Sequence, residues 1–228
     1  MKTYKYRHEI KYKISNSAAE VLKQKLSLIL KKDKNAFYED GSYIIKSLYF
    51  DDRDSSSYYE KLDGVLYRKK YRIRIYNDND TFIRLEKKMK HNNMTAKEQM
   101  LISKDIYSKI LEGRLDEIEG ATGLLEEFIA ASKNKGLIPS IIVEYHRIAF
   151  TYPTCDVRIT FDSNITSGLY DYDLFNKEGV RYPVIEKGKQ VLEVKYNEAL
   201  PLHIANILND IPHSREAVSK FAICRSIK

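Results

Sequence analysis

Basic residues at alternate positions dominate the stretch from Leu66 to Lys90. From Arg68 to Arg74 every second residue is a lysine or an arginine, whereas the positions between them include Tyr71 and Ile73. Alternate side chains of a β-strand share one face of the sheet. A face with so many like charges repels itself and requires an anionic partner. The pattern therefore predicts a hairpin that binds an anion on one face.

The second half of this stretch repeats the alternation. Its polar positions are Arg84, Glu86, Lys88 and Lys90, and its apolar positions include Ile83, Leu85 and Met89. The two runs are joined by residues 77–80, Asn-Asp-Asn-Asp, which are turn formers. Two further runs alternate in the same way, with Arg158 in 156–162 and Glu193 and Lys195 in 190–196. The charged face therefore belongs to a whole sheet.

The composition limits the class of protein. The chain has 228 residues, a net charge of +7 and 43% hydrophobic residues, which suits one domain over 1–228. The basic excess indicates nucleic acid, an anionic membrane or a phosphorylated ligand as partner. Two cysteines, Cys155 and Cys224, exclude a disulfide framework and a multi-thiolate metal site. No apolar stretch approaches the roughly 20 residues of a membrane span, so we expect a cytoplasmic protein.

The remaining elements are expected from periodicity and from helix start and stop signals. Strands are predicted at 4–14, 44–51, 66–76, 81–90, 141–151, 156–162 and 190–196, giving seven or eight in all. Helices are predicted from Ser17, with a capping box, to about Lys31, and at 55–62, 104–111, 124–135, 205–210 and 215–226. A flexible loop is predicted at 91–96. Short connections favour antiparallel pairing, but periodicity leaves open whether the polar faces meet bulk water or line a closed interior.

Eight short motifs occur in an order that carries a resemblance. They are HEIKY at 8–12, SLYFD at 47–51, YRIRIY at 71–76, LEKK at 85–88, YHRIAF at 145–150, VRITFD at 157–162, LEVKY at 192–196 and SKF at 219–221. Together they resemble the polyphosphate polymerase domain of the vacuolar transporter chaperone (VTC), within the CYTH-like triphosphate tunnel metalloenzymes. The resemblance implies an α+β fold: an antiparallel eight-stranded β-barrel, the triphosphate tunnel, with flanking helices.

The resemblance also implies a function and a set of site residues. Members bind ATP, triphosphate or polyphosphate with a divalent cation, Mn²⁺ or Mg²⁺, and the polymerases transfer the γ-phosphoryl of ATP to a polyphosphate chain. The residues that match the phosphate-contacting and catalytic positions are Lys11, Arg72, Arg74, Lys88, Arg147, Arg158, Ser219 and Lys220, with Lys97, Lys195 and Arg215 as further basic positions. Glu193 matches the metal-binding glutamate, and Glu9 and Glu86 lie where related enzymes place carboxylates.

One position departs from the family pattern. The polymerases have a lysine two residues before the serine, where this chain has Ala217, and Arg215 is the nearest cation that would compensate. The chemistry itself suits the composition, because phosphoryl transfer requires positioning and charge neutralisation more than a nucleophilic side chain. Arginine forks and lysines supply that charge. The departure weakens polymerase turnover more than phosphate binding.

Other functions remain open from the sequence. A triphosphatase would use the same lining, and a degenerate tunnel would bind polyphosphate without turnover. An RNA-binding sheet is disfavoured, because its aromatic rings share the basic face, whereas most strand tyrosines here lie opposite the arginines. We therefore expect no nucleic-acid partner. A polymerase that exports its product would need a separate membrane partner, since this chain has no predicted span of its own.

Overall fold

The computed structural model describes residues 3–211, 214–215 and 218–227, with the side chains of 214 and 215 left out of the description. Its strands are β1 Arg7–Ser15, β2 Lys31–Lys32, β3 Ser42–Asp51, β4 Tyr67–Tyr76, β5 Ile83–His91, β6 Met94–Ile102, β7 Ile138–Tyr152, β8 Val157–Gly168, β9 Tyr182–Pro183, β10 Lys189–Tyr196 and β11 Ser214–Arg215. Its α-helices are α1 Asn16–Ser27, α2 Ser56–Leu62, α3 Lys104–Leu111, α4 Gly123–Lys135, α5 Leu202–Asn209 and α6 Lys220–Arg225. Two short 3-10 helices, η1 Leu115–Glu117 and η2 Thr154–Asp156, complete the described elements.

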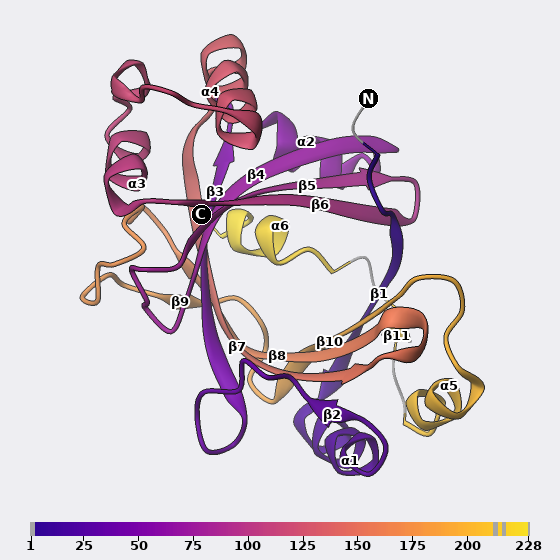
Figure 1. Cartoon of the computed structure of the whole chain (residues 1–228). Helices are drawn as coiled ribbons and strands as arrows, with labels where there is room; N and C mark the ends of the chain where they lie inside the picture. Colours follow the sequence, from indigo (N-terminus) through magenta and orange to yellow (C-terminus); the bar gives the residue numbers. More distant parts are fainter. Residues whose placement is uncertain (1–2, 212–213, 216–217, 228) are drawn as a thin grey trace.

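The eight long strands form a closed antiparallel ring. Their order is β7-β3-β4-β5-β6-β1-β10-β8, and β8 pairs back to β7. The junction between β6 and β1 is short, with Arg7 opposite Thr95 and His8 opposite Met94. Closure leaves each strand of the ring with a face toward the interior (Figure 1). The structure thus decides for the closed arrangement that periodicity left open.

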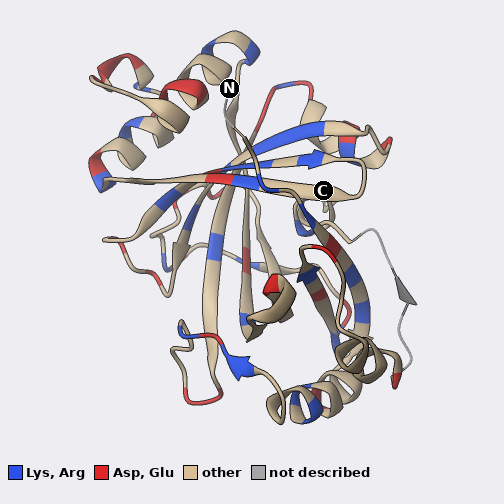
Figure 2. Cartoon of the chain, turned by 45° about the vertical axis from the view of Figure 1, so that its right-hand side comes forward, with Lys and Arg blue, Asp and Glu red and all other residues tan. Residues whose placement is uncertain are grey.

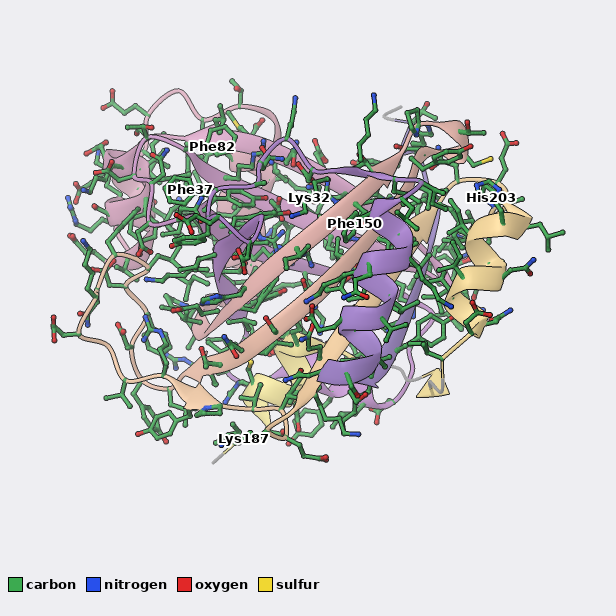
Figure 3. The ribbon with its side chains drawn as sticks, turned by 90° about the horizontal axis from the view of Figure 1, so that it is seen from below. Lys32, Phe37, Phe82, Phe150, Lys187 and His203 are labelled. Carbon is green, nitrogen blue, oxygen red and sulfur yellow. The ribbon has the colours of Figure 1, made fainter. Side chains whose placement is uncertain are left out.

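Helices cover the apolar outer faces of the ring. One core joins β3, β4 and β5 to α3 and α4, where Ile73 and Leu85 pack with Phe128. A second core joins β7, β8 and β10 to α1 and α5, and Figure 3 shows α1 lying across the strands beside Phe150. Because helices cover these apolar faces and keep them from water, the polar face of each strand points inward.

Part of the ring interior is also apolar. Tyr145 of β7 and Val191 of β10 pack with Phe221 and Cys224 of α6. In the view of Figure 1, α6 lies between the two sides of the ring, and it contacts both β7 and β8. The ring of Phe221 lies 5.0 Å from that of Tyr49 on β3. The C-terminal helix therefore fills part of the interior beside the polar lining.

Three local predictions differ from the structure. The N-cap of α1 lies two residues earlier than predicted, because the Ser15 hydroxyl, not that of Ser17, accepts the Ala18 N–H at 3.1 Å, and the helix ends at Ser27 instead of near Lys31, which belongs to β2. The predicted loop at 91–96 is a tight turn, after which β6 starts at Met94. The predicted helix at 215–226 is shorter: Arg215 pairs through its backbone with Tyr12 of β1, and α6 begins at Lys220.

The register of strand pairing explains how side chains from different strands come to face one site. Arg72 of β4 lies opposite Glu86 of β5, and Lys11 of β1 lies opposite Glu193 of β10. Residues directly opposite in a sheet share a face. The ring thus points acids and bases from neighbouring strands into the same space.

Candidate functional site

A cavity of about 450 Å³ occupies the polar part of the ring interior. Its volume lies in the range usual for small-molecule sites, roughly 300–1,000 Å³. It is lined by Glu9, Ile10, Lys11, Tyr49, Lys61, Arg68, Lys70, Arg72, Arg74, Lys88, Lys90, Asn93, Thr95, Tyr145, Arg147, Glu193, Lys195, Val218, Ser219, Lys220 and Phe221. Figure 2 shows the basic residues recurring along successive strands. The described lining holds eleven lysines and arginines but only two glutamates.

Glu86 of β5 holds the arginines of β4 in place, although it does not itself line the cavity. Its side chain is fully buried, and Arg72 donates to it from Nε at 2.7 Å and from Nη2 at 2.6 Å. Arg74 Nη1 lies 3.8 Å away, and Lys97 Nζ donates to the other carboxylate oxygen at 3.1 Å. Burial acts to raise the pKa of Glu86, but these three cations outweigh it and hold the pKa well below the ordinary value. The carboxylate therefore stays ionised and fixes the guanidinium planes.

Asp162 has the same role on β8. Arg147 of β7 binds it in a bidentate pair, with nitrogen to oxygen distances of 2.6 and 2.7 Å. Lys220 Nζ of α6 lies 2.5 Å from the same carboxylate and 4.9 Å from the centre of the Tyr145 ring. Burial acts to raise the pKa of Asp162, but Arg147 and Lys220 lower it overall. A strand carboxylate thus ties the C-terminal helix to the cavity wall.

Two carboxylates, Glu9 and Glu193, face the cavity itself. Glu9 accepts from Lys88 Nζ at 2.6 and 2.9 Å and lies 3.1 Å from Lys11 Nζ. Glu193 lies 2.5 Å from Lys195 and 3.8 Å from both Arg147 and Lys220. Burial and Glu193 act to raise the pKa of Glu9, yet Lys88, Lys11 and Lys195 outweigh them and leave it lowered. Both carboxylates are therefore anionic oxygen donors at neutral pH.

The positions of the carboxylates determine which of them are suited to hold a divalent cation. Among the residues that the structure describes, no group of three or more His, Cys, Asp or Glu side chains is arranged to hold a metal on its own. Mg²⁺ in phosphate sites is usually held by one or two carboxylates together with substrate phosphates and water. Glu9 and Glu193 meet that requirement, since Lys195 lies 3.9 Å from the first and 2.5 Å from the second. Glu86 does not line the cavity, and its oxygens already contact three cations.

Most of the residues predicted for the site lie together in this cavity. They are Lys11, Arg72, Arg74, Lys88, Arg147, Lys195, Ser219, Lys220, Glu9 and Glu193. The Ser219 hydroxyl also accepts the Ala222 N–H at 3.3 Å as the N-cap of α6. Ala217 and the side chain of Arg215 lie outside the described residues.

Two predicted basic residues lie outside the cavity lining. Arg158 Nη2 is 2.5 Å from Asp33 and donates to the Tyr43 hydroxyl at 2.9 Å. Lys97 pairs with Glu86 at 3.1 Å, and so acts on the site through that carboxylate. Both residues stand on the inward face of their strands, in register with Lys195 and Lys88 respectively. The alternation in the sequence predicted the correct face for both residues, but it did not show whether they line the cavity.

The family motifs missed four cations of the lining: Lys61, Arg68, Lys70 and Lys90. Three of them were visible as members of the alternating basic face, and only their assignment to the site was lacking. Lys61 lies in α2, where its sequence neighbours carry no periodic signal. Tyr49 was missed as well, although its hydroxyl accepts from Arg72 Nη1 at 2.7 Å.

Comparison with protein families gives a match to the VTC domain over residues 6–227. The chain belongs to the VTC domain family. No curated protein matches the chain. Among the helices of the described residues, none combines the length and the apolar character needed to cross a bilayer.

Solved structures share the fold of this VTC domain. One is HpAC1 from Hippeastrum, a putative adenylyl cyclase described as having a dominant triphosphatase activity; it has 17% identity and a TM-score of 0.56, with 96% of this chain and 95% of that one covered. Another is a putative adenylate cyclase from Vibrio parahaemolyticus, with 12% identity and a TM-score of 0.51, covering 97% and 98%. The predicted α+β ring with flanking helices is thereby confirmed.

Proposed function

We propose that this VTC domain binds the triphosphate of ATP in its cavity and transfers the γ-phosphoryl group to a polyphosphate chain. The observation that carries the proposal is the composition of the lining, eleven cations with two carboxylates in about 450 Å³. A concentration of like charge destabilises the empty protein and is useful only with a polyanion. Membership of the VTC family and the fold shared with HpAC1 support a triphosphate as that polyanion.

The residues of the centre have distinct tasks. Arg72 and Arg74, fixed by Glu86, present forks to phosphate oxygens, and Arg147 does so from β7, where Asp162 fixes it. Preorganised cations of this kind stabilise the charge that spreads over the transferred phosphoryl group. Each buried carboxylate holds its arginine in place before the substrate arrives, which reduces the reorganisation that the reaction requires.

Glu193 and Glu9 would hold the divalent cation, Mg²⁺ or Mn²⁺, beside the phosphates. When bound, such an ion neutralises phosphate charge and orients the oxygens of the substrate. The lysines that now pair with the two carboxylates, above all Lys195 and Lys88, would then turn to phosphate oxygens. Glu86 is left with the structural task of fixing the arginines.

The state of the carboxylates favours transfer to phosphate over transfer to water. A phosphate oxygen at the end of a polyphosphate chain is already anionic and attacks without losing a proton, whereas water requires a base. The pKa of Glu9 and that of Glu193 are both lowered by surrounding lysines, which makes these carboxylates poor bases. A triphosphatase remains the second candidate, since HpAC1 shares the fold and is described with that activity.

Product analysis tests the proposal. Purified protein is incubated with ATP and Mn²⁺ or Mg²⁺, with and without a polyphosphate primer, and in parallel with tripolyphosphate. Polymerase activity yields ADP and a lengthened chain, a triphosphatase yields free phosphate from tripolyphosphate, and a binder yields neither. Binding is measured separately as a rise in melting temperature with tripolyphosphate, which a ligand of the folded state must produce. Absence of that rise would reject the phosphate site altogether.

The metal assignment has its own test in Glu193→Gln. The substitution keeps the shape of the side chain but removes the anionic oxygen ligand. We expect turnover to lose its dependence on Mn²⁺, with tripolyphosphate binding largely retained. Glu112→Gln, at an exposed glutamate paired with Arg114, is the matched control. Unchanged metal dependence in Glu193→Gln would make Glu193 an ion-pair residue only.

A further inference from the structure

The segment 28–38, which leads from the end of α1 through β2 toward β3, exposes several apolar side chains to solvent. They are Leu28, Ile29, Phe37 and Tyr38, exposed by 84%, 41%, 65% and 42%. The rings of Phe37 and Tyr38 lie 5.1 Å apart. A single exposed apolar residue is common on a protein surface, whereas a group of them marks an interaction site. The segment is therefore a candidate docking surface.

Backbone hydrogen bonds fix the conformation of this segment. The N–H groups of Phe37 and Tyr38 both donate to the Ser42 carbonyl at 3.0 Å. The Asp33 N–H donates to the Ala149 carbonyl of β7 at 2.8 Å, and the Asp33 side chain is buried. Because the loop is held at both ends, its aromatic rings do not fold back onto the core. Their contact with water is unfavourable and is built into the fold.

The same segment also carries uncompensated positive charge. Its exposed lysines are Lys31, Lys32 and Lys34. Its one acid, Asp33, is buried and lies 2.5 Å from Arg158 of β8, so it does not neutralise them. Among the described residues, no carboxylate pairs with the three lysines, and Lys32 donates only to the backbone carbonyl of Asp40, at 3.1 Å. Apolar and basic side chains thus occur together on one exposed segment.

The far end of the molecule has the opposite charge. Residues 112–127, which connect α3 to α4 and begin α4, include six acids and one arginine. Figures 1 and 2 both show α3 and α4 at the upper end and α1 with β2 at the lower end. A separation of charge along a molecule orients it in the field of a charged surface. A negative surface therefore attracts the end that carries the segment 28–38.

We propose that the segment 28–38 docks this protein on the surface of an anionic lipid bilayer. Its apolar and aromatic side chains enter the boundary between headgroups and acyl chains, and its lysines contact the lipid phosphates. A nucleic acid would leave Leu28 and Ile29 in water, and protein interfaces are depleted in lysine, so neither accounts for the whole segment. The proposal is independent of the proposed function, because no residue of the segment lines the cavity.

Co-sedimentation with lipid vesicles tests the proposal. The vesicles contain phosphatidylcholine alone or phosphatidylcholine with about a third phosphatidylglycerol, which supplies the negative surface. The protein should bind the anionic vesicles, more weakly as salt rises, and should not bind phosphatidylcholine alone. Leu28→Ser and Phe37→Ser should each weaken binding about tenfold, since each removes an apolar side chain that becomes buried. Lys31→Gln combined with Lys34→Gln should weaken it about fivefold per lysine.

Matched controls separate this segment from the rest of the surface. Leu101→Ser and Tyr170→Ser remove apolar side chains that are 56% and 85% exposed elsewhere. Lys135→Gln combined with Lys177→Gln removes two exposed lysines and changes the net charge equally. All of these controls should bind vesicles as the wild type does. Every variant should keep its melting temperature and its response to tripolyphosphate, because the changed residues are exposed and lie outside the cavity.

A fluorescent reporter gives a second, independent readout. The chain contains no tryptophan, so Phe37→Trp introduces a single one. Its emission should shift to shorter wavelength on anionic vesicles and should be quenched by spin-labelled lipid, since the ring enters an apolar layer. Tyr170→Trp, at an exposed position outside the segment, should show neither change.

The possible outcomes support or overturn the proposal. It is overturned if the wild type does not bind anionic vesicles, or if the two serine variants bind them as the wild type does. Binding that requires the lysines but not Leu28 or Phe37 would be electrostatic adsorption alone, which also overturns it. If Arg74→Ala abolishes vesicle binding, lipid headgroups enter the cavity and the segment is not the docking surface. Selective loss in the variants of the segment, with tripolyphosphate binding unchanged, supports it.

Discussion

Two parts of the cavity differ in whether their positive charge is compensated by buried carboxylates. At the centre, Arg72 and Arg147 form ion pairs with the buried carboxylates of Glu86 and Asp162, which compensate their charge before any ligand arrives. At the end of the cavity lined by Lys61, Arg68, Lys70 and Lys90, the buried Lys70 Nζ has no hydrogen-bond partner among the described residues. A compensated cation is held rigidly and suits a reacting group, whereas an uncompensated one gains most when a polyanion arrives. We therefore expect the compensated cations to position a ligand and Lys70 to gain the most when an anion arrives.

The largest expected effect comes from breaking the compensation at the centre. Glu86→Gln leaves Arg72 and Arg74 close together in a buried site without their shared anion. Removing one partner of a buried ion pair typically costs about 3–5 kcal/mol of stability, and the amide retains some hydrogen bonding, so we expect about 3 kcal/mol. Urea denaturation measures it, with Glu112→Gln at an exposed pair as control. A loss below about 0.5 kcal/mol would show that Glu86 does not hold the arginines, since that is the range of ordinary surface changes.

Removing an arginine instead of its carboxylate should affect turnover. In Arg74→Ala, Glu86 keeps two hydrogen bonds from Arg72, so the free protein should be as stable as before or slightly more stable. Turnover of ATP should nonetheless fall about 100-fold, as when one preorganised charge stabiliser is removed. Arg114→Ala, at an exposed arginine, should change neither quantity. A destabilised Arg74→Ala protein with full turnover would make Arg74 a structural residue.

The uncompensated lysine should give a pH-dependent effect of smaller size. Lys70 has a pKa of about 7 in the folded protein against an ordinary value of 10.5, so between these values the unfolded chain binds more protons. Stability therefore rises with pH through this window, and the cost of burying the charge is full below pH 7. Lys70→Met should gain about 0.5–2 kcal/mol at neutral pH, the range usual when functional strain is removed.

Urea denaturation at several pH values measures this gain. The gain should shrink as pH rises toward 10.5, because the wild-type amine is then neutral in both states. A gain of the same size at all pH values would point to better packing against Phe221 instead of a relieved charge.

The smallest effect is expected for a lysine outside the ring. Lys25 of α1 pairs with Asp210 at 2.7 Å in an exposed position. Exposed pairs of this kind contribute about 0–1 kcal/mol. Lys25→Met should therefore leave stability within about 0.5 kcal/mol and turnover unchanged, measured by urea denaturation and by the ATP assay. A large effect there would mean that net charge alone governs the cavity.

The sequence failed where local preference and tertiary context disagree. The strand β6 contains Ala96, Lys97, Glu98 and Gln99, which are poor strand formers, and its outward face carries Glu98. That glutamate lies 2.9 Å from Lys87 of β5, so pairing with the neighbouring strand stabilises what local preference does not. Ring closure requires β6 to pair with β5 on one side and with β1 on the other. No periodicity in the sequence indicates that requirement.

Along the chain, the sequence alone determined which side chains share a face. The period of two at 66–90 separated Arg72 and Arg74 from Tyr71 and Ile73, and the structure confirms the separation. That result follows from the geometry of a single strand, which every residue in it obeys. The same pattern, with the family motifs, brought together ten of the residues that line the cavity.

Only the tertiary structure decided which of those charges are paired and which are free. The sequence predicted Glu86 as a carboxylate of the site, and ring closure places it outside the cavity lining, among Arg72, Arg74 and Lys97. Lys70 has the same place in the pattern as Arg72, yet its Nζ has no hydrogen-bond partner. Charge compensation depends on distances of a few ångströms between strands that are far apart in the chain, because Coulomb energy in a buried site varies steeply at that range. Those distances exist only once the ring has closed.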